Sequence, residues 1–114
     1  MATEDDLRAA MQLDRIIHEP ARLLIVAILY AEKSGQFPSL LHRTRLTNGN
    51  LHTHLQKLEQ AGYIQAEVGY RGKKAFKIWR LSEFGQAAFE IYQGKLQRIA
   101  DYLSDLTDSS DHPA

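Results

Sequence analysis

The feature that most constrains the fold of this chain is a change in hydrophobic spacing at Gly62. Before it, Leu51, Leu55 and Leu58 recur at intervals of four and three residues, which places them on one face of a helix. After it, residues 64, 66 and 68 are apolar in alternation, as in a strand with one buried face. A helix that ends at a glycine and leads directly into a strand leaves few topologies for one small domain.

The strand after Gly62 predicts a β-hairpin with a cationic tip. Residues 69–74 read GYRGKK, a basic loop hinged by glycines, and the chain then returns with Phe76, Ile78 and Trp79, residue types that favour strands. We expect the hairpin to cover about residues 63–81. Its tip is a candidate binding surface, although exposed turns are often basic and a solvated tip is the plain alternative.

The N-terminal part of the chain is helical by its spacing. The apolar residues of segment 7–17 predict one helix with acids in its first turn. Pro20 suits the first position of a second helix over residues 21–31, which is apolar nearly all round and is therefore expected to be buried. Ser34 and Gly35 are expected to end this helix, with glycine as a left-handed cap.

Two further helices complete the expected order of elements. A short helix near residues 39–45 is followed by a turn at residues 46–49, directly before the helix of the three leucines. After the hairpin, Ser82 is placed to cap a long helix over about residues 83–106, whose apolar residues recur every three or four positions. Residues 107–114 form a polar tail that we expect to be frayed.

A formal net charge of zero conceals a basic centre between acidic ends. Residues 42–80 carry eight Lys or Arg against two acids, a net charge of +6, whereas residues 1–41 carry −2 and residues 81–114 carry −4. Charge of one sign concentrated in one part of a chain indicates a surface that faces a polyanion. Random scatter of charges is the competing explanation.

The helix over residues 50–61 has an acid-free polar face. Solvated helix faces usually mix both charge signs, so this face is a candidate contact surface. Thr47 is placed to cap the start of the helix, which leaves backbone N–H groups where an anion could bind. The residues opposite the leucines are Gly49, Asn50, Thr53, Gln56, Lys57 and Gln60.

Two histidines in this helix, His52 and His54, are not spaced as a metal site. They are two residues apart and so lie about 200° apart around the helix, whereas chelation from one helix needs a spacing of three or four. His54 is expected at the edge of the core and His52 on the flank. We expect no metal and no cofactor.

Several functional classes find no support in the sequence. The chain contains no cysteine, which excludes disulfides and thiolate chemistry. It has no nucleophile elbow, phosphate-binding glycine loop or histidine–carboxylate constellation, so we expect no enzyme. The longest apolar run, nine residues at 23–31, is about half of what a bilayer needs, and acids stand near the N-terminus where a signal peptide has positive charge. We therefore expect a cytoplasmic protein without a membrane partner.

The order of elements resembles the winged-helix DNA-binding family of ArsR- and MarR-like transcriptional regulators of bacteria and archaea. The resemblance spans about residues 13–103 and rests on HEPARLLIVAIL, LTNGNLHTHLQKLEQAGYI and RGKKAFKIWRLSEFG. It implies that residues 48–61 enter the major groove of DNA, that residues 69–74 follow the backbone or minor groove, and that the protein is a homodimer. The expected fold is one mainly α domain over residues 1–106, a winged helix-turn-helix with a small β-hairpin and extra N- and C-terminal dimerisation helices.

On this resemblance we expect the polar face to read DNA bases. Asn and Gln side chains can make two hydrogen bonds to adenine, and Thr can touch a thymine methyl. Plain solvation of the same residues is the alternative. The expected DNA-binding residues are Thr47, Asn48, Asn50, Thr53, Gln56 and Lys57, with His52 at the border, and Arg71, Lys73 and Lys74 in the wing.

The terminal helices carry more apolar surface than a small winged-helix body can bury, which indicates an interface between two copies. The alternative is that the last helix folds back over the first two within one chain. A symmetric dimer predicts a palindromic site with half-sites about one helical turn, or a multiple of it, apart. The expected interface residues are Leu7, Met11, Ile17, Tyr92, Leu96, Ile99, Leu103 and Leu106.

The expected function is a sequence-specific DNA-binding transcriptional regulator, with double-stranded DNA and a second copy as partners and repression as the favoured direction. The short helix reads SLLHRTRL and lacks the cysteines that metal-sensing members carry there, so thiolate metal sensing is excluded. A small-molecule effector is compatible with the family, but no cluster in the sequence identifies its pocket. The alternative function is a winged helix used as a protein-interaction module without sequence-specific DNA binding.

Overall fold

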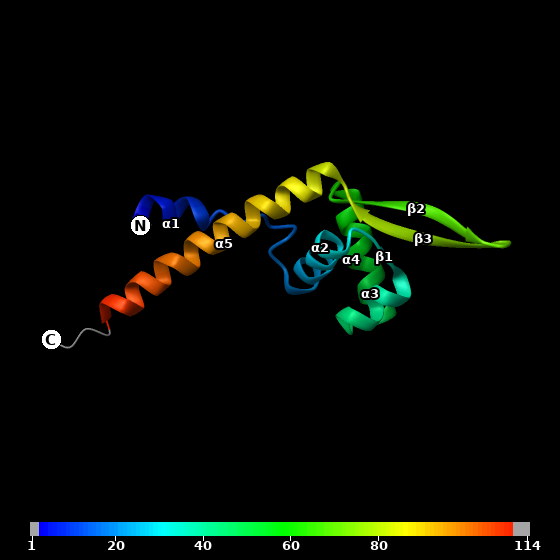
Figure 1. The fold of residues 1–114 in the computed structure, drawn as a ribbon, viewed down its shortest axis with the longest axis horizontal. Helices are drawn as coiled ribbons and strands as arrows, with labels where there is room; N and C mark the ends of the chain where they lie inside the picture. Colours follow the sequence, from blue (N-terminus) through cyan, green and yellow to red (C-terminus); the bar gives the residue numbers. More distant parts are fainter. Residues whose placement is uncertain (1–2, 111–114) are drawn as a thin grey trace.

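The computed structural model describes residues 3–110 and has the expected winged helix-turn-helix fold with a long C-terminal helix (Figure 1). The hairpin and this last helix project from the body in opposite directions, so the molecule measures 71 × 25 × 21 Å. In chain order the elements are α1 (Glu4–Ala10), α2 (Pro20–Glu32), β1 (Gly35–Gln36), α3 (Phe37–Thr44), α4 (Asn48–Gln60), β2 (Ile64–Arg71), β3 (Lys74–Leu81) and α5 (Glu83–Ser110).

Helix α2 forms the centre of the core, as its apolar sequence predicted. Pro20 stands in its first turn, and the Glu19 carboxylate caps it by accepting hydrogen bonds from the backbone N–H groups of Ala21 and Arg22, at 3.1 and 2.8 Å. The side chains of the core come from every helix of the body and from the sheet. They include Ile25 and Leu29 of α2, Leu40 of α3, Leu51, Leu55 and Leu58 of α4, Ile64 of β2, Trp79 of β3 and Phe89 of α5.

The N-terminal segment is not the single helix predicted over residues 7–17. Helix α1 ends at Ala10, and Asp14 Oδ1 then accepts hydrogen bonds from the backbone N–H groups of Ile16 and Ile17, at 2.8 and 3.1 Å. The bend lets Ile17 enter the core, where it is fully buried. The helical spacing predicted one helix because apolar residues occur throughout the segment. The two halves pack in different places, however: α1 packs along α5, and Ile17 packs in the core of the body.

The sheet has three strands in the order β1–β3–β2, one strand more than predicted. Strand β1 pairs antiparallel with Trp79 and Ile78 of β3. Ser34 and Gly35 do not end α2, which closes at Lys33 in a left-handed conformation with φ 74°. Gly35 is a strand residue instead. A strand of two residues has no alternation that a sequence pattern could reveal.

The wing has a tighter turn than the loop predicted over residues 69–74. Strands β2 and β3 pair continuously until Arg71 meets Lys74, so the turn consists of Gly72 and Lys73. Gly72 has a φ of 60°, and two-residue hairpin turns place glycine at such positions. Gly69 lies within β2 because the Phe76 ring packs over it: a Cβ added there would come within 2.7 Å of the ring.

The wing and α5 start from one tight joint. Gly62, with a φ of 85°, ends α4 as predicted. Ser82 Oγ donates to the Gly62 carbonyl oxygen at 2.5 Å and accepts from the Gly85 N–H at 2.9 Å, which is the predicted cap of α5. The Tyr63 carbonyl oxygen accepts from the Ser82 N–H at 3.0 Å and lies so close to Gly85 that an added Cβ would overlap it. The pattern Leu-Ser-x-x-Gly is therefore a packing requirement.

Helix α5 continues to Ser110, beyond the end predicted at residue 106. Residues 107–110 of the predicted polar tail are thus helical, and residues 111–114 lie outside the described part of the chain. Helix α1 lies beside α5, where Lys95 Nζ donates to the Gln12 carbonyl oxygen at 2.7 Å (Figure 1). No helix within residues 3–110 is long and apolar enough to cross a membrane.

Candidate nucleic-acid interface

Helix α4 presents the predicted polar face because its opposite face is held in the core. Leu51, Leu55 and Leu58 are at most 1% exposed, which fixes the rotation of the helix. Thr47 Oγ1 accepts from the Asn50 N–H at 3.1 Å and caps the helix as predicted. The side chains that face solvent are those of Asn48, Asn50, His52, Thr53, Gln56 and Lys57.

The start of α4 keeps free donors beside these side chains. The N–H groups of Asn48 and Gly49 precede the first capped position, and no partner for them exists within residues 3–110. Thr53 Oγ1 donates to the Gly49 carbonyl oxygen at 2.9 Å, so its hydroxyl proton is used by the helix and its methyl group remains free. This end of α4 can therefore offer backbone donors to an anion and a methyl group to an apolar base edge.

His54 packs against the start of α2, at the edge of the core where the sequence predicted it. Its Nδ1 lies 3.4 Å from Arg22 Nη1 and 3.7 Å from Glu19 Oε2. Arg22 is itself 8% exposed and donates from Nε to the Ile16 carbonyl oxygen at 2.6 Å. Partial burial acts to raise the pKa of Glu19, but hydrogen bonds from the Arg22 and Ala21 N–H groups, with His54 and Arg22 nearby, hold it below its ordinary value. This polar cluster joins α4 to the start of α2.

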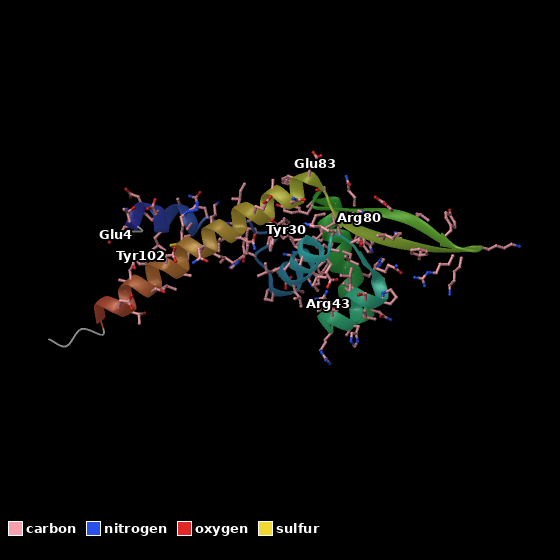
Figure 2. The ribbon with its side chains drawn as sticks, in the orientation of Figure 1. Glu4, Tyr30, Arg43, Arg80, Glu83 and Tyr102 are labelled. Atoms are coloured by element: carbon pink, nitrogen blue, oxygen red, sulfur yellow. The ribbon has the colours of Figure 1, made fainter. Side chains whose placement is uncertain are left out.

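The wing carries the predicted cations with no carboxylate to neutralise them. Arg71, Lys73 and Lys74 are exposed, and none of them lies within 4.0 Å of an acidic group among the described residues. The Arg71 guanidinium stacks 5.2 Å from the centre of the Phe76 ring, which stiffens it. Arg80 lies at the base of the wing (Figure 2). It is paired instead with Glu67, at 3.3 Å.

Helix α4 and the wing border one cleft of about 500 Å³. His52 contributes from α4, Arg71 and Lys74 contribute from the wing, and Phe37 and Pro38 of α3 form a further wall. The structure thus brings together two segments that are separate in the sequence. No group of three His, Asp or Glu side chains in the described part of the chain is arranged to hold a metal ion.

One cation of this surface, Lys77, was not among the residues predicted from the sequence. It lines the same cleft, and its Nζ lies 5.4 Å from the centre of the Trp79 ring. The signal was present, because Lys77 belongs to the basic segment 42–80, but strand alternation gave it no special position. Arg43, in contrast, is paired with Glu32 and is therefore less available to a polyanion.

The predicted interface between copies needs correction at two positions. Ile17 and Tyr92 are 0% and 2% exposed within the single chain, so neither is available to a partner. The hydroxyl group of Tyr92 instead contacts His18, whose Nδ1 lies 2.7 Å from the phenol oxygen. Burial of the Tyr92 side chain raises its pKa, and the negative charge of Asp14 raises this pKa further.

The other predicted interface residues keep some exposure. Leu7 and Ile99 are half-buried, consistent with the packing of α1 along α5. The exposed predicted residues are Met11, Leu96, Leu103 and Leu106. Phe84 and Ile91, 54% and 60% exposed, were not predicted as part of this surface. Their spacing of seven places them on one face of α5 and was the available signal.

Comparison with known proteins gives the family. The winged helix DNA-binding domain family matches residues 21–100, which run from the second residue of α2 through α3, α4 and the wing into α5. An uncharacterized protein of Methanocaldococcus jannaschii is 31% identical over 78 residues, which cover 68% of this chain and 85% of that protein.

Two solved structures show the same fold. The transcriptional regulator homologue protein from Pyrococcus horikoshii OT3 superposes with a TM-score of 0.76 at 23% identity, covering 87% of this chain and 97% of that one. A MarR-family putative transcriptional regulator from Enterococcus faecalis V583 gives a TM-score of 0.64 at 14% identity, covering 96% and 93%. From the extent of the family match, this chain belongs to the winged helix DNA-binding domain family.

Proposed function

We propose that the protein is a sequence-specific DNA-binding repressor that acts as a homodimer on a palindromic site. The observation that carries this proposal is the cleft shared by α4 and the wing. His52, at the border of the polar face of α4, lines the same opening as Arg71, Lys74 and Lys77 of the wing, so one DNA duplex can meet both elements. Phosphate contacts would supply affinity through the wing, and base contacts from α4 would supply specificity.

The dimer is proposed from the apolar surface at the far end of the molecule. Leu103 and Leu106 are 55% and 51% exposed on α5, although α1 already packs beside that helix. Exposed apolar stripes of this length mark interfaces. A second copy that covers them would place two α4 helices on one side of the assembly, and two-fold symmetry then calls for a palindromic site. A bound dimer would repress by covering DNA that other proteins need.

Base reading by α4 is tested with substitutions that separate specific from general binding. A gel shift on pooled genomic fragments first selects a preferred site. Asn50→Ala and Gln56→Ala should then each cost about 1–3 kcal/mol on that site and little on random DNA. Gln86→Ala, an exposed residue of α5, is the matched control and should leave both affinities unchanged.

The results of these gel shifts distinguish between the two candidate functions. Equal losses on the preferred site and on random DNA would remove base reading from α4. If no fragment is preferred and no duplex binds, the protein-interaction function replaces the regulator. Repression itself is read from transcription in vitro, where added dimer should lower synthesis from a promoter that contains the site.

A further inference from the structure

The two faces of the wing carry different side chains, because successive residues of a strand point to opposite faces. Trp79 is buried, so its face of the hairpin is the one turned toward the body. We call this the inner face of the wing and the opposite one the outer face. Residues that pair across the two strands share a face. From the register, the residues that share the inner face with Trp79 are Ala66, Val68, Tyr70, Ala75 and Lys77.

The outer face is occupied by contacts within the hairpin. The half-buried ring of Phe76 packs over Gly69, and the Arg71 guanidinium stacks on the same ring at 5.2 Å. Nearer the body, Glu67 and Arg80 form the ion pair described above. The ring and both members of the ion pair therefore already have partners.

The inner face begins in the core and continues into solvent. At its base, Ile64 and Ala66 of β2 pack in or against the core. Farther along the same face, Val68 and Tyr70 are 59% and 70% exposed. Valine and tyrosine favour strands wherever they stand, so their exposure alone requires no partner. Their position relative to α4 is the informative observation.

The inner face is turned toward α4. Lys77 and Trp79 line a small cavity of about 140 Å³ together with His52 and Gln56 of α4. Glu59 also lines it, but among the described residues no ion pair within 4.0 Å joins Glu59 to Lys77. A duplex that lies against the polar face of α4 would therefore meet the inner face of the wing and not the outer face.

We propose that Val68, Tyr70 and Lys77 contact the sugar–phosphate backbone of the duplex that α4 reads, and so position the protein on DNA. The Tyr70 hydroxyl donates to a phosphate oxygen while its ring lies against a deoxyribose. Val68 packs against a neighbouring sugar, and Lys77 neutralises a phosphate. The inference rests on the proposed function and goes beyond it by naming the face of the wing that meets the duplex.

A protein partner fits this face less well than DNA does. A stable protein interface buries about 800 Å² on each partner, whereas the exposed apolar surface here consists of two side chains beside a lysine. A second copy that used the same face would bring its Lys77 close to this one, and like charges oppose such pairing. A DNA backbone uses the ring, the hydroxyl and the ammonium group together.

The direct test is photo-crosslinking from two aromatic positions that lie near the tip on different faces. In one variant p-azidophenylalanine takes the place of Tyr70, and in the other it takes the place of Phe76. Each full-length variant is irradiated with a radiolabelled duplex that carries the preferred site. We expect crosslinked DNA mainly from position 70. Equal yields, or a greater yield from position 76, would overturn the assignment of the inner face.

A pair of charge substitutions tests the same assignment by affinity. Val68 and Gln65 are both exposed on β2, on the inner and the outer face respectively. A carboxylate on the inner face would repel phosphates, so Val68→Glu should weaken binding to any duplex at least about tenfold. Gln65→Glu adds the same charge opposite Arg80 and should change the affinity by less than about twofold.

Two milder substitutions test the individual contacts. Tyr70→Phe removes only the hydroxyl group and should weaken binding about fivefold, on the preferred site and on random DNA alike. Lys77→Gln should flatten the log–log salt dependence by about 0.9, the value for one phosphate contact. Arg80→Gln is the matched control on the outer face of β3, and it should leave the slope unchanged because Arg80 is paired with Glu67.

The results separate this inference from the proposed function. Circular dichroism reports whether each variant folds, and the crosslinking pair decides the question for any that does not. Wild-type protein that binds its site and loses preference with Gln56→Ala, but is unaffected by Val68→Glu and Tyr70→Phe, would remove this inference alone. A wild-type chain that binds no duplex would overturn both.

Discussion

The wing and the distal half of α5 project from opposite sides of one body, and different forces hold each of them in shape (Figure 1). The wing is a hairpin whose strands pair with each other along their length, so it needs little else to keep its form. The distal helix satisfies its own backbone, but Leu103 and Leu106 remain about half exposed. Within residues 3–110, the element that packs along this distal part is α1.

The charges of the two ends also differ. Arg71, Lys73 and Lys74 crowd the tip of the wing, whereas the first turn of α1 at the other end consists of acids. There the Thr3 N–H and hydroxyl bind the Asp6 carboxylate and hold its pKa below the ordinary value. The tip of the wing thus lacks counter-charge among the described residues, and the exposed leucines of the distal helix lack apolar contact there. In the proposed function DNA supplies the first and a second copy supplies the second.

Removal of the apolar surface of α5 should have the largest effect. Leu103→Asp with Leu106→Asp should convert the dimer to a 13.0 kDa monomer, because charged groups cannot be buried unpaired in an interface. Affinity for a two-half-site operator should fall at least about a hundredfold, because a monomer can occupy only one half-site at a time. Sedimentation and gel shifts measure the two effects.

The matched control for this variant is Gln97→Asp with Ser104→Asp, two exposed positions that lie about 100° or more around α5 from both leucines. It adds the same charge and should leave assembly intact. A wild-type chain that sediments as a monomer and still binds the operator tightly would contradict the dimer.

The second largest effect is expected at the joint where Ser82 and Gly85, at the start of α5, pack against Gly62 and Tyr63. Gly85→Ala should lower the free energy of unfolding by about 3 kcal/mol, because the new methyl group overlaps the Tyr63 carbonyl oxygen. Gly94→Ala is the control within the same helix: its Cβ would lie at an ordinary 3.5 Å from Arg98 Nη1, so helix propensity should stabilise the protein by about 1 kcal/mol. Urea denaturation measures the free energy of unfolding of both variants. An equal change in the two variants would mean that the joint is not tightly packed.

Removal of wing charge should weaken DNA binding without sequence preference. Lys73→Ala with Lys74→Ala should flatten the log–log salt dependence of the binding constant by about 0.9 for each phosphate that the wing no longer neutralises. Arg8→Ala, at the acidic end, should leave the slope unchanged. A slope that the wing variant does not alter would place the wing outside the interface.

The smallest expected effect concerns the start of α4. Thr47→Ala removes the side-chain oxygen that accepts from the Asn50 N–H and should cost about 1 kcal/mol of stability. Thr47→Ser keeps the oxygen and should be close to neutral. Thermal unfolding measures both, and an alanine variant as stable as the serine variant would show that this cap contributes nothing.

The sequence predicted most of the fold because its signals were local. The leucines of α4, the glycine at position 62 and the cap at Ser82 each depend on residues within a few positions, and the structure has all of them as predicted. The polar face of α4 followed directly from the leucine spacing. The wing cations followed from composition, although Lys77 did not stand out in a strand.

The errors arose where distant segments decide the outcome. Strand β1 forms because β3 offers it an edge, and two residues carry no pattern of their own. Tyr92 belongs to the apolar stripe of α5 and was therefore predicted at the interface. It is buried instead, and its hydroxyl contacts His18, which lies 74 residues earlier in the sequence. Helix α5 continues over residues 107–110, which are polar and therefore show no apolar periodicity that could have predicted it.

By itself, the sequence determined the type of each long element, the orientation of α4 and the separation of basic and acidic segments, because spacing, caps and charge are properties of the chain. Only the tertiary structure decided which apolar residues remain exposed, since burial depends on the segments that meet in space. It placed Ile17 and Tyr92 in the core and left Leu103 and Leu106 outside it. It also set His52 beside the wing, which no spacing along the chain could show.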